Sequence, residues 1–230
     1  MTDSPVRFRL VNDVAVIEFD DGKANALTAT SLDALGEAFS RAEAEAKAVV
    51  LVGRPGRFCA GFDLSVMTQG IQHAVALVAR GGELLLRIYE HPQPVVAACT
   101  GHAVAGGALL VLSCDTRIGA LGDFKLGLNE TAIDMALPLL GRELARDRLS
   151  PKHLIEAAVQ ARLYDPQEAV QVGYLDAVVD PERVLDEAVA AAERLSKLSL
   201  RAYAITKREL RRDTIAKVRA GMAEDLKRMG

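Results

Sequence analysis

The chain has 230 residues, half of them hydrophobic, and its formal net charge is −3. This length fits one domain, or one domain with a small appendage, and the charge gives no indication of a nucleic-acid partner. The three cysteines, Cys59, Cys99 and Cys114, match neither a zinc pattern nor a disulfide framework, so we predict no metal site. The N-terminus lacks the apolar core of a signal peptide, and the apolar runs do not fit a membrane span. We therefore expect a soluble, cytoplasmic protein with no membrane partner.

The first two thirds of the sequence alternate predicted strands with predicted helices. Apolar residues in alternating and in continuous runs predict the strands Val6–Leu10, Val14–Phe19, Lys47–Val52, Val95–Cys99, Thr116–Ile118 and Leu175–Val179. Apolar residues at helical spacing predict the helices Thr28–Ala44, Leu77–Tyr89, Pro138–Leu149, Lys152–Ala161, Pro181–Ser196 and Leu198–Met229. The run Asp165-Pro166-Gln167-Glu168 predicts the start of another helix, which ends at Gly173. This order favours an α/β core of parallel strands followed by a helical C-terminal part.

The central stretch Val95–Asp115 joins a predicted strand to a predicted helix, Ala108–Leu112, through several glycines. A helix start leaves free backbone N–H groups, and glycine lets a ligand approach them closely. These donors attract negative charge, but the residues around the glycines fit neither a phosphate loop nor a dinucleotide fingerprint. A third possible ligand is an oxygen that becomes negative only during a reaction. A tight turn without any ligand explains this stretch alone equally well.

A second glycine stretch, Arg57–Ser65, also follows a predicted buried strand. Parallel strands place their C-terminal ends at one edge of a sheet, where ligands bind. One backbone N–H from each stretch can therefore reach a single oxygen, as an enolate or a tetrahedral oxyanion requires.

Three segments with this order and spacing resemble the crotonase family, the enoyl-CoA hydratases and isomerases: Arg57–Ser65, Gly101–Asp115 and Gly127-Leu128-Asn129-Glu130. The resemblance implies a crotonase-like α/β fold of the ClpP/crotonase type, a spiral of ββα units with a helical C-terminal region. It divides the chain into a spiral core, residues 1–180, and a shortened helical region for trimerisation, residues 181–230. It also implies an acyl-CoA substrate, no cofactor apart from the coenzyme A of that substrate, and a homotrimer or a dimer of trimers.

The resemblance places an oxyanion hole at the N–H groups of Phe62 and Gly106. The glycine triplet of the family reads Ala105-Gly106-Gly107 here, a departure that keeps Gly106 itself. Contacts with the substrate and its coenzyme A are implied at Lys23, Ala24, Ala26, Ala60, Gly61, Asp63, Leu64, Gly107 and Leu109.

The family's hydratases use two glutamates, and this chain keeps only the second, Glu130. The first position is Leu109, which cannot move a proton. One carboxylate suffices to take a proton from C2 of a 3-enoyl thioester and return it at C4, so the resemblance favours the Δ3,Δ2-enoyl-CoA isomerases. We expect apolar neighbours to raise the pKa of Glu130 toward the range of a general base. The alternatives are an enoyl-CoA hydratase, another crotonase reaction such as thioester hydrolysis or decarboxylation, and a non-catalytic acyl-CoA-binding scaffold.

A few further polar residues are weaker candidates. Asp134 follows Glu130 by four residues, in a segment with one helical turn at most, and we favour a capping role over that of a second acid. His102 fits a structural or pocket-lining role better than that of a base. Basic residues are in excess at the C-terminus, which predicts a solvated helix face. The alternative is that Lys207, Arg208, Arg211 and Arg212 contact ligand phosphates.

Overall fold

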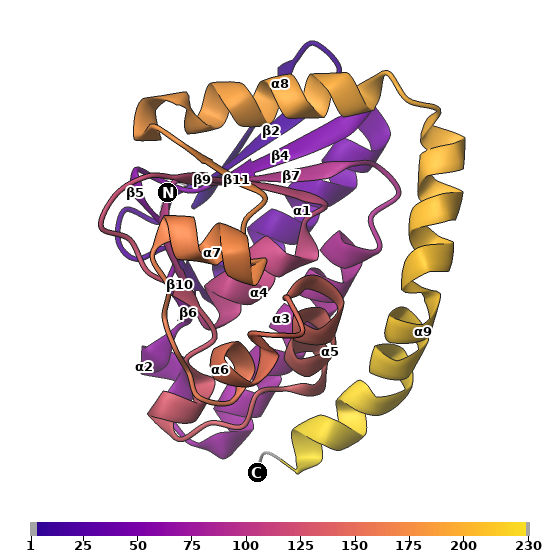
Figure 1. Cartoon of the computed structure of the whole chain (residues 1–230). Helices are drawn as coiled ribbons and strands as arrows, with labels where there is room; N and C mark the ends of the chain where they lie inside the picture. Colours follow the sequence, from indigo (N-terminus) through magenta and orange to yellow (C-terminus); the bar gives the residue numbers. More distant parts are fainter. Residues whose placement is uncertain (1–3, 229–230) are drawn as a thin grey trace.

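The computed structural model describes residues 4–228. Its main sheet has the strand order β1-β2-β4-β7-β9-β11, with helices on both faces (Figure 1). The strands are β1 (Val6–Val11), β2 (Val14–Phe19), β4 (Ala48–Val52), β7 (Val95–Cys99), β9 (Thr116–Ala120) and β11 (Ala177–Val179). β1 and β2 form the predicted antiparallel hairpin, with Val6 opposite Phe19, and the other neighbouring strands are parallel. The predicted core of parallel strands is confirmed.

Five short strands form two smaller sheets. β5 (Gly56–Cys59), β8 (Gly101–Val104) and β10 (Leu126–Gly127) are parallel in the order β10-β8-β5, and β3 (Ala26–Leu27) pairs with β6 (Gly61–Phe62). Because β5 and β8 each follow a strand of the main sheet closely, the chain repeats a strand–strand–helix unit. The sequence patterns predict none of these short strands. They contain two to four residues and several glycines, too few side chains to show a period.

The helices agree with the prediction apart from their ends. They are α1 (Ala29–Glu45), α2 (Leu64–Met67), α3 (Ile71–Tyr89), α4 (Gly106–Ser113), α5 (Leu139–Arg148), α6 (Leu154–Ala158), α7 (Pro166–Val172), α8 (Val184–Ser196) and α9 (Leu200–Lys227). The patterns miss α2, a single turn, and start α3 at Leu77 instead of Ile71. Met229, the predicted end of the last helix, lies outside the described residues. Of the helices within residues 4–228, none is long and apolar enough to cross a membrane.

The predicted helix start at Asp165 is confirmed. The Asp165 side chain accepts a hydrogen bond from Glu168 N at 2.8 Å, and the Glu168 side chain completes the capping box. Gly173 ends α7 with a φ of 102°, a conformation that glycine adopts without strain.

Apolar side chains pack on both faces of the main sheet. β4 and β7 are buried along their whole length, as their continuous apolar runs predict. On one face α8 packs its small side chains, such as Ala188 and Ala192, against Val50 and Val96. On the other face α1, α3 and α4 enclose the larger part of the core. Figure 1 shows α8 and α4 on opposite sides of the sheet, and α9 along one side of the molecule.

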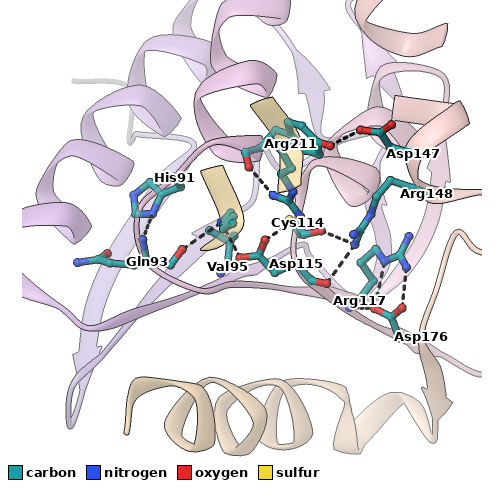
Figure 2. Close-up of polar contacts among 12 residues, drawn as sticks. His91, Gln93, Val95, Cys114, Asp115, Arg117, Asp147, Arg148, Asp176 and Arg211 are labelled. Carbon is teal, nitrogen blue, oxygen red and sulfur yellow. Dashed lines mark hydrogen bonds and ion pairs between the residues drawn. The ribbon is translucent and has the colours of Figure 1, made fainter. Parts of the chain in front are cut away.

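A buried ion-pair cluster around Asp115 holds α9 to the core (Figure 2). Asp115 Oδ2 accepts hydrogen bonds from Val95 N, at the start of β7, at 2.8 Å and from Lys207 Nζ at 2.7 Å. Arg211 Nη2 lies 3.0 Å from Asp115 Oδ1. Burial lowers the pKa of Lys207, whose side chain is only 7% exposed. Lys207 and Arg211, two of the four basic residues considered as phosphate ligands, are therefore held in this buried cluster.

Replacing Lys207 by Met tests this anchor. The substitution keeps the apolar stem but removes the cation closest to the buried Asp115 carboxylate, so we expect the free energy of unfolding to fall by about 3 kcal/mol. Arg212→Met on the same helix removes an exposed pair with Glu209 and should cost less than about 1 kcal/mol. Urea unfolding at pH 7 measures both variants. Equal losses would show that Asp115 does not anchor α9.

Candidate active site

Two backbone turns are in direct contact at the ends of β5 and β8. The chain passes from β5 into β6 at Gly61, with a φ of 92°, and from β8 into α4 at Ala105, with a φ of 49°. A methyl group built on Gly61 would lie 3.2 Å from Ala105 Cβ and 3.3 Å from Gly106 N. A positive φ at a non-glycine residue is strained, and such strain is frequent at functional sites. The structure thus brings the two predicted glycine stretches together.

Each turn offers a backbone N–H that its own strand or helix does not use. Asp63 N donates to Leu27 O in β3 at 3.2 Å. Because successive N–H groups of a strand point in opposite directions, the Phe62 N–H points away from β3. Gly106 is the first residue of α4, so its N–H has no carbonyl partner within the helix. This geometry is compatible with the predicted pair of oxyanion donors.

Glu130 begins a single 3-10 turn, Glu130–Ile133, shortly after β10. The side chain is buried, with 6% exposed, and within the described part of the chain its Oε2 atom has no hydrogen-bond partner. This burial raises the pKa of Glu130 to about 7. A carboxyl group with this pKa can accept and donate a proton near neutral pH.

A largely apolar cavity of about 230 Å³ connects Glu130 with the two turns. It brings together five of the predicted site residues, Ala60, Phe62, Leu64, Leu109 and Glu130. The rest of its wall consists of Met67, Val78, Val104, Ala105, Asn129, Ile133, Met135 and Pro138. Within residues 4–228, Glu130 is the only acidic side chain that lines it. The cavity therefore combines one poised carboxyl group with an apolar space.

Asp134 lies outside this cavity. Its side chain is exposed, its φ is 60°, and its N–H donates to the Glu130 carbonyl at the end of the 3-10 turn. Asp134 thus has a capping role, but it ends the turn that precedes it and does not start the next one, as the sequence had suggested. The geometry gives no support to Asp134 as a second acid.

The predicted coenzyme A loop, Lys23–Ala26, lies beside the turn at Gly61. Ala60 N donates to Ala24 O at 3.2 Å, and Lys23 is exposed. Asn25, which the sequence analysis did not single out, fixes this loop: it is fully buried, and its Nδ2 atom donates to Phe19 O at 2.6 Å and to Phe58 O at 3.2 Å. Only its position in the predicted loop, between two alanines, could have signalled this role.

The remaining predicted residues support the backbone of the site. Asp63 caps α2, its side chain accepting from Ser65 N at 2.9 Å. A methyl group on Gly107 would overlap the Cys59 carbonyl oxygen, so Gly107 lets α4 pack on β5. His102 lies outside the cavity, where its Nδ1 accepts from Lys125 N at 3.1 Å, which fits the predicted structural role.

The cysteines add no reactive thiol to the site. Burial raises the pKa of all three thiols, Cys59, Cys99 and Cys114, to about 12, which makes them inert. Within residues 4–228, no group of His, Cys, Asp or Glu side chains is placed to hold a metal ion.

The fold and the site together define a class of protein: an α/β protein built of strand–strand–helix units, with a buried carboxyl group beside two glycine turns. The model of the enoyl-CoA hydratase/isomerase family matches residues 9–229. The chain therefore belongs to this family, the crotonase family, and has the α/β crotonase fold with a long C-terminal helix.

The relatives include proteins named for both reactions. The chain is 31% identical to the human mitochondrial enoyl-CoA delta isomerase 1, over 89% of this chain and 70% of that protein. It is 32% identical to a putative enoyl-CoA hydratase of Thermus thermophilus, over 84% of this chain and 79% of that protein. The crystal structure of an enoyl-CoA hydratase/isomerase family protein from Pseudomonas syringae is similar with a TM-score of 0.97 at 37% identity, covering 100% of both chains. At these identities the relatives do not decide between isomerase and hydratase.

The buried Glu130 carboxyl makes the stability of the protein depend on pH. Its pKa is about 7 in the folded chain and 4.5 in the unfolded one, so folding favours the protonated form. The resulting penalty is absent below pH 4.5, grows as the pH rises, and reaches about 3 kcal/mol above pH 7. Glu130→Gln removes it, so this variant should be more stable than the wild type by about 3 kcal/mol at pH 8.5 and by less than about 1 kcal/mol at pH 5.

Urea unfolding at the two pH values measures this difference. The exposed Asp134→Asn variant, whose new side chain tolerates the same backbone conformation, is the control and should show no such dependence on pH. A Glu130→Gln variant that is no more stable than the wild type at pH 8.5 would contradict the burial of an unpaired carboxylate.

Proposed function

We propose that the protein is a Δ3,Δ2-enoyl-CoA isomerase that moves the double bond of a 3-enoyl-CoA to position 2. One observation carries the proposal: Glu130 is the only acidic side chain lining the cavity within residues 4–228, and Leu109 lines the same cavity where the hydratases of the family have their other glutamate. A base facing an apolar wall suits proton transfer between two carbons of one substrate.

The reaction needs one base and one oxyanion site. The Glu130 carboxylate takes a proton from C2 of the 3-enoyl thioester, and the electron pair moves onto the thioester oxygen. The N–H groups of Phe62 and Gly106 donate to this oxygen, and loss of one such donor typically lowers kcat by about 10²- to 10³-fold. The protonated Glu130 then returns the proton at C4. The electron pair of the former C3–C4 double bond makes the new C4–H bond, and the pair on the oxygen re-forms the thioester carbonyl. The C1–C2 pair of the enolate becomes the C2–C3 double bond, and the carboxylate is regenerated.

The raised pKa of Glu130 supports this cycle. An exposed glutamate is too weak a base to compete for a carbon-bound proton, whereas a pKa of about 7 matches the task at neutral pH. The burial also argues against a scaffold without turnover, because an unpaired buried carboxylate lowers stability and brings no benefit to mere binding.

Hydration is the main alternative, but among the described residues the cavity lacks the second acid–base side chain that this reaction needs. Adding water across a double bond requires one group to activate the water and another to protonate the carbon. Asp134 is exposed and outside the cavity, and Asn129, the other polar side chain in the wall, does not titrate. Thioester hydrolysis and decarboxylation remain family alternatives that no specific contact favours.

In this proposal the coenzyme A of the substrate contacts the loop Lys23–Ala26 and the residues Ala60, Gly61, Asp63 and Leu64. Leu64 lines the cavity and is 67% exposed, and Lys23 is exposed as well. Assembly as a homotrimer or a dimer of trimers, through residues 181–230, is part of the same proposal and rests on the resemblance to the family.

Offering 3-enoyl-CoA and 2-enoyl-CoA in parallel tests the reaction. The wild type should convert 3-enoyl-CoA to 2-enoyl-CoA and add no water to either substrate. Glu130→Gln should lower kcat at least about 10²-fold, since it removes the only base. Asp134→Asn should keep the wild-type rate. Formation of 3-hydroxyacyl-CoA by the wild type, detected by chromatography of the products, would contradict the proposal.

Leu109→Glu tests the assignment of position 109. A second carboxylate facing Glu130 across the cavity should hold a water molecule and add measurable hydration of 2-enoyl-CoA. Leu109→Gln, of nearly the same size but without a charge, is the matched control and should add none. If the Glu variant folds and binds acyl-CoA but hydrates nothing, position 109 does not face the reacting carbons.

A further inference from the structure

The aromatic ring of Phe62 lies in a slot between two glycines. A methyl group on Gly81, in the middle of α3, would overlap Phe62 Cε1 and lie 2.5 Å from its Cζ. A methyl group on Gly106 would lie 3.1 Å from Cε2 and 3.2 Å from Cδ2, on the other edge of the ring. The ring therefore cannot move away from Gly81 without meeting the start of α4.

Gly81 is an interior residue of its helix. Glycine in a helix interior is less favourable than alanine because it loses more backbone freedom on folding. Gly36 occupies a comparable interior position in α1, and a methyl group there would meet nothing within 4 Å. Gly81 thus has a packing reason that Gly36 lacks, and the reason is the Phe62 ring.

To the pairing of β6 with β3 the ring adds a constraint on the Phe62 peptide. On either side of it, β3 and its loop hold Ala60 N and Asp63 N by hydrogen bonds of 3.2 Å each, but the Phe62 N–H points away from β3. No bond to β3 holds that N–H itself, so the seat of the Phe62 side chain contributes to its orientation. Since Gly106 contacts the same ring, the slot adds a side-chain contact between the two turns to the backbone contact at Gly61.

We infer that Gly81 is a positioning residue: by seating the Phe62 ring against Gly106, it keeps the two backbone N–H donors aimed at one thioester oxygen. The inference rests on the proposed function, because it assigns Gly81 to the oxyanion hole that the function needs. Gly81 itself does not touch the reacting atoms.

Gly81→Ala is the direct test. The added methyl group should displace the ring and lower kcat by about 10- to 100-fold, with KM changed by less than about threefold, because the donors act on the transition state. Gly36→Ala is the matched control, and it should keep the wild-type kcat. A rise in KM alone would overturn the inference, because it would mean that the ring merely turns into the cavity.

A double mutant separates positioning from general damage to α3. Phe62→Ala keeps the backbone donor but removes the ring, and it should lower kcat by itself. In that background Gly81→Ala should change kcat by less than about twofold, since no ring remains to be displaced. Equal effects of Gly81→Ala in both backgrounds would overturn the inference.

Phe62→Leu is the alternative test if Gly81→Ala does not fold. The leucine side chain is too short to fill the slot, so this variant should show the same loss of kcat. A wild-type kcat in Phe62→Leu would overturn the inference.

A spectroscopic probe keeps this test apart from the test of the isomerase reaction. Acetoacetyl-CoA forms an enolate with near-ultraviolet absorbance, and an oxyanion hole increases the enolate fraction of the bound ligand. The wild type should increase this absorbance, Gly36→Ala should match it, and Gly81→Ala should reduce it at saturating ligand. A wild type that forms the enolate but does not isomerise 3-enoyl-CoA would refute the proposed function without contradicting the positioning role of Gly81. Equal absorbance in the wild type and Gly81→Ala, or no absorbance in the wild type, would refute the positioning role of Gly81.

Discussion

The close approach of backbone to backbone at the ends of β5 and β8 is the constraint on which this structure depends. A methyl group on Gly101 would overlap Gly56 and lie 2.6 Å from Arg57 N, and one on Gly107 would overlap the Cys59 carbonyl oxygen. Only glycine permits these contacts, which bring β8 and the start of α4 against β5. The turn at Gly61 then reaches Gly106. If these strands lay farther apart, two N–H groups from separate units could not serve one oxygen.

The second requirement is a carboxyl group that the fold keeps buried although its burial lowers stability. The segment before Glu130 is fixed from the C-terminal side: Leu126 and Tyr164 exchange two backbone hydrogen bonds of 3.0 and 2.9 Å, and Leu128 N donates to Tyr174 Oη at 3.3 Å. These contacts fix the backbone that leads into the 3-10 turn and so help to keep Glu130 buried. The elevated pKa is thus a property of the surrounding structure and not of the turn alone.

How much the sequence reveals depends on whether a feature is local. The caps at Asp165 and Gly173, the hairpin, and the buried strands follow from short patterns and are confirmed. The two glycine stretches stand out from the strands before them, but Glu130 is found only because three weak motifs occur in a family order. The short strands, the anchoring role of Asn25 and the slot at Gly81 escape, because each depends on a partner far along the chain. In the sequence Gly81 is only a glycine within a predicted helix, and its role becomes visible only through its contact with the Phe62 ring.

The C-terminal helix links these features to the rest of the chain. In its first half α9 is held by Asp115 through Lys207 and Arg211. Near its end Asp225 accepts from Leu139 N and pairs with Arg142 Nη2, both at 2.6 Å. These bonds fix the first turn of α5, directly after Pro138, which lines the cavity of Glu130. Met222 of α9 packs against Gly82 of α3, next to the glycine that seats Phe62. Because α9 packs against both α5 and α3, which flank the site, this helix belongs to the structural unit that forms the cavity, whatever part it takes in assembly.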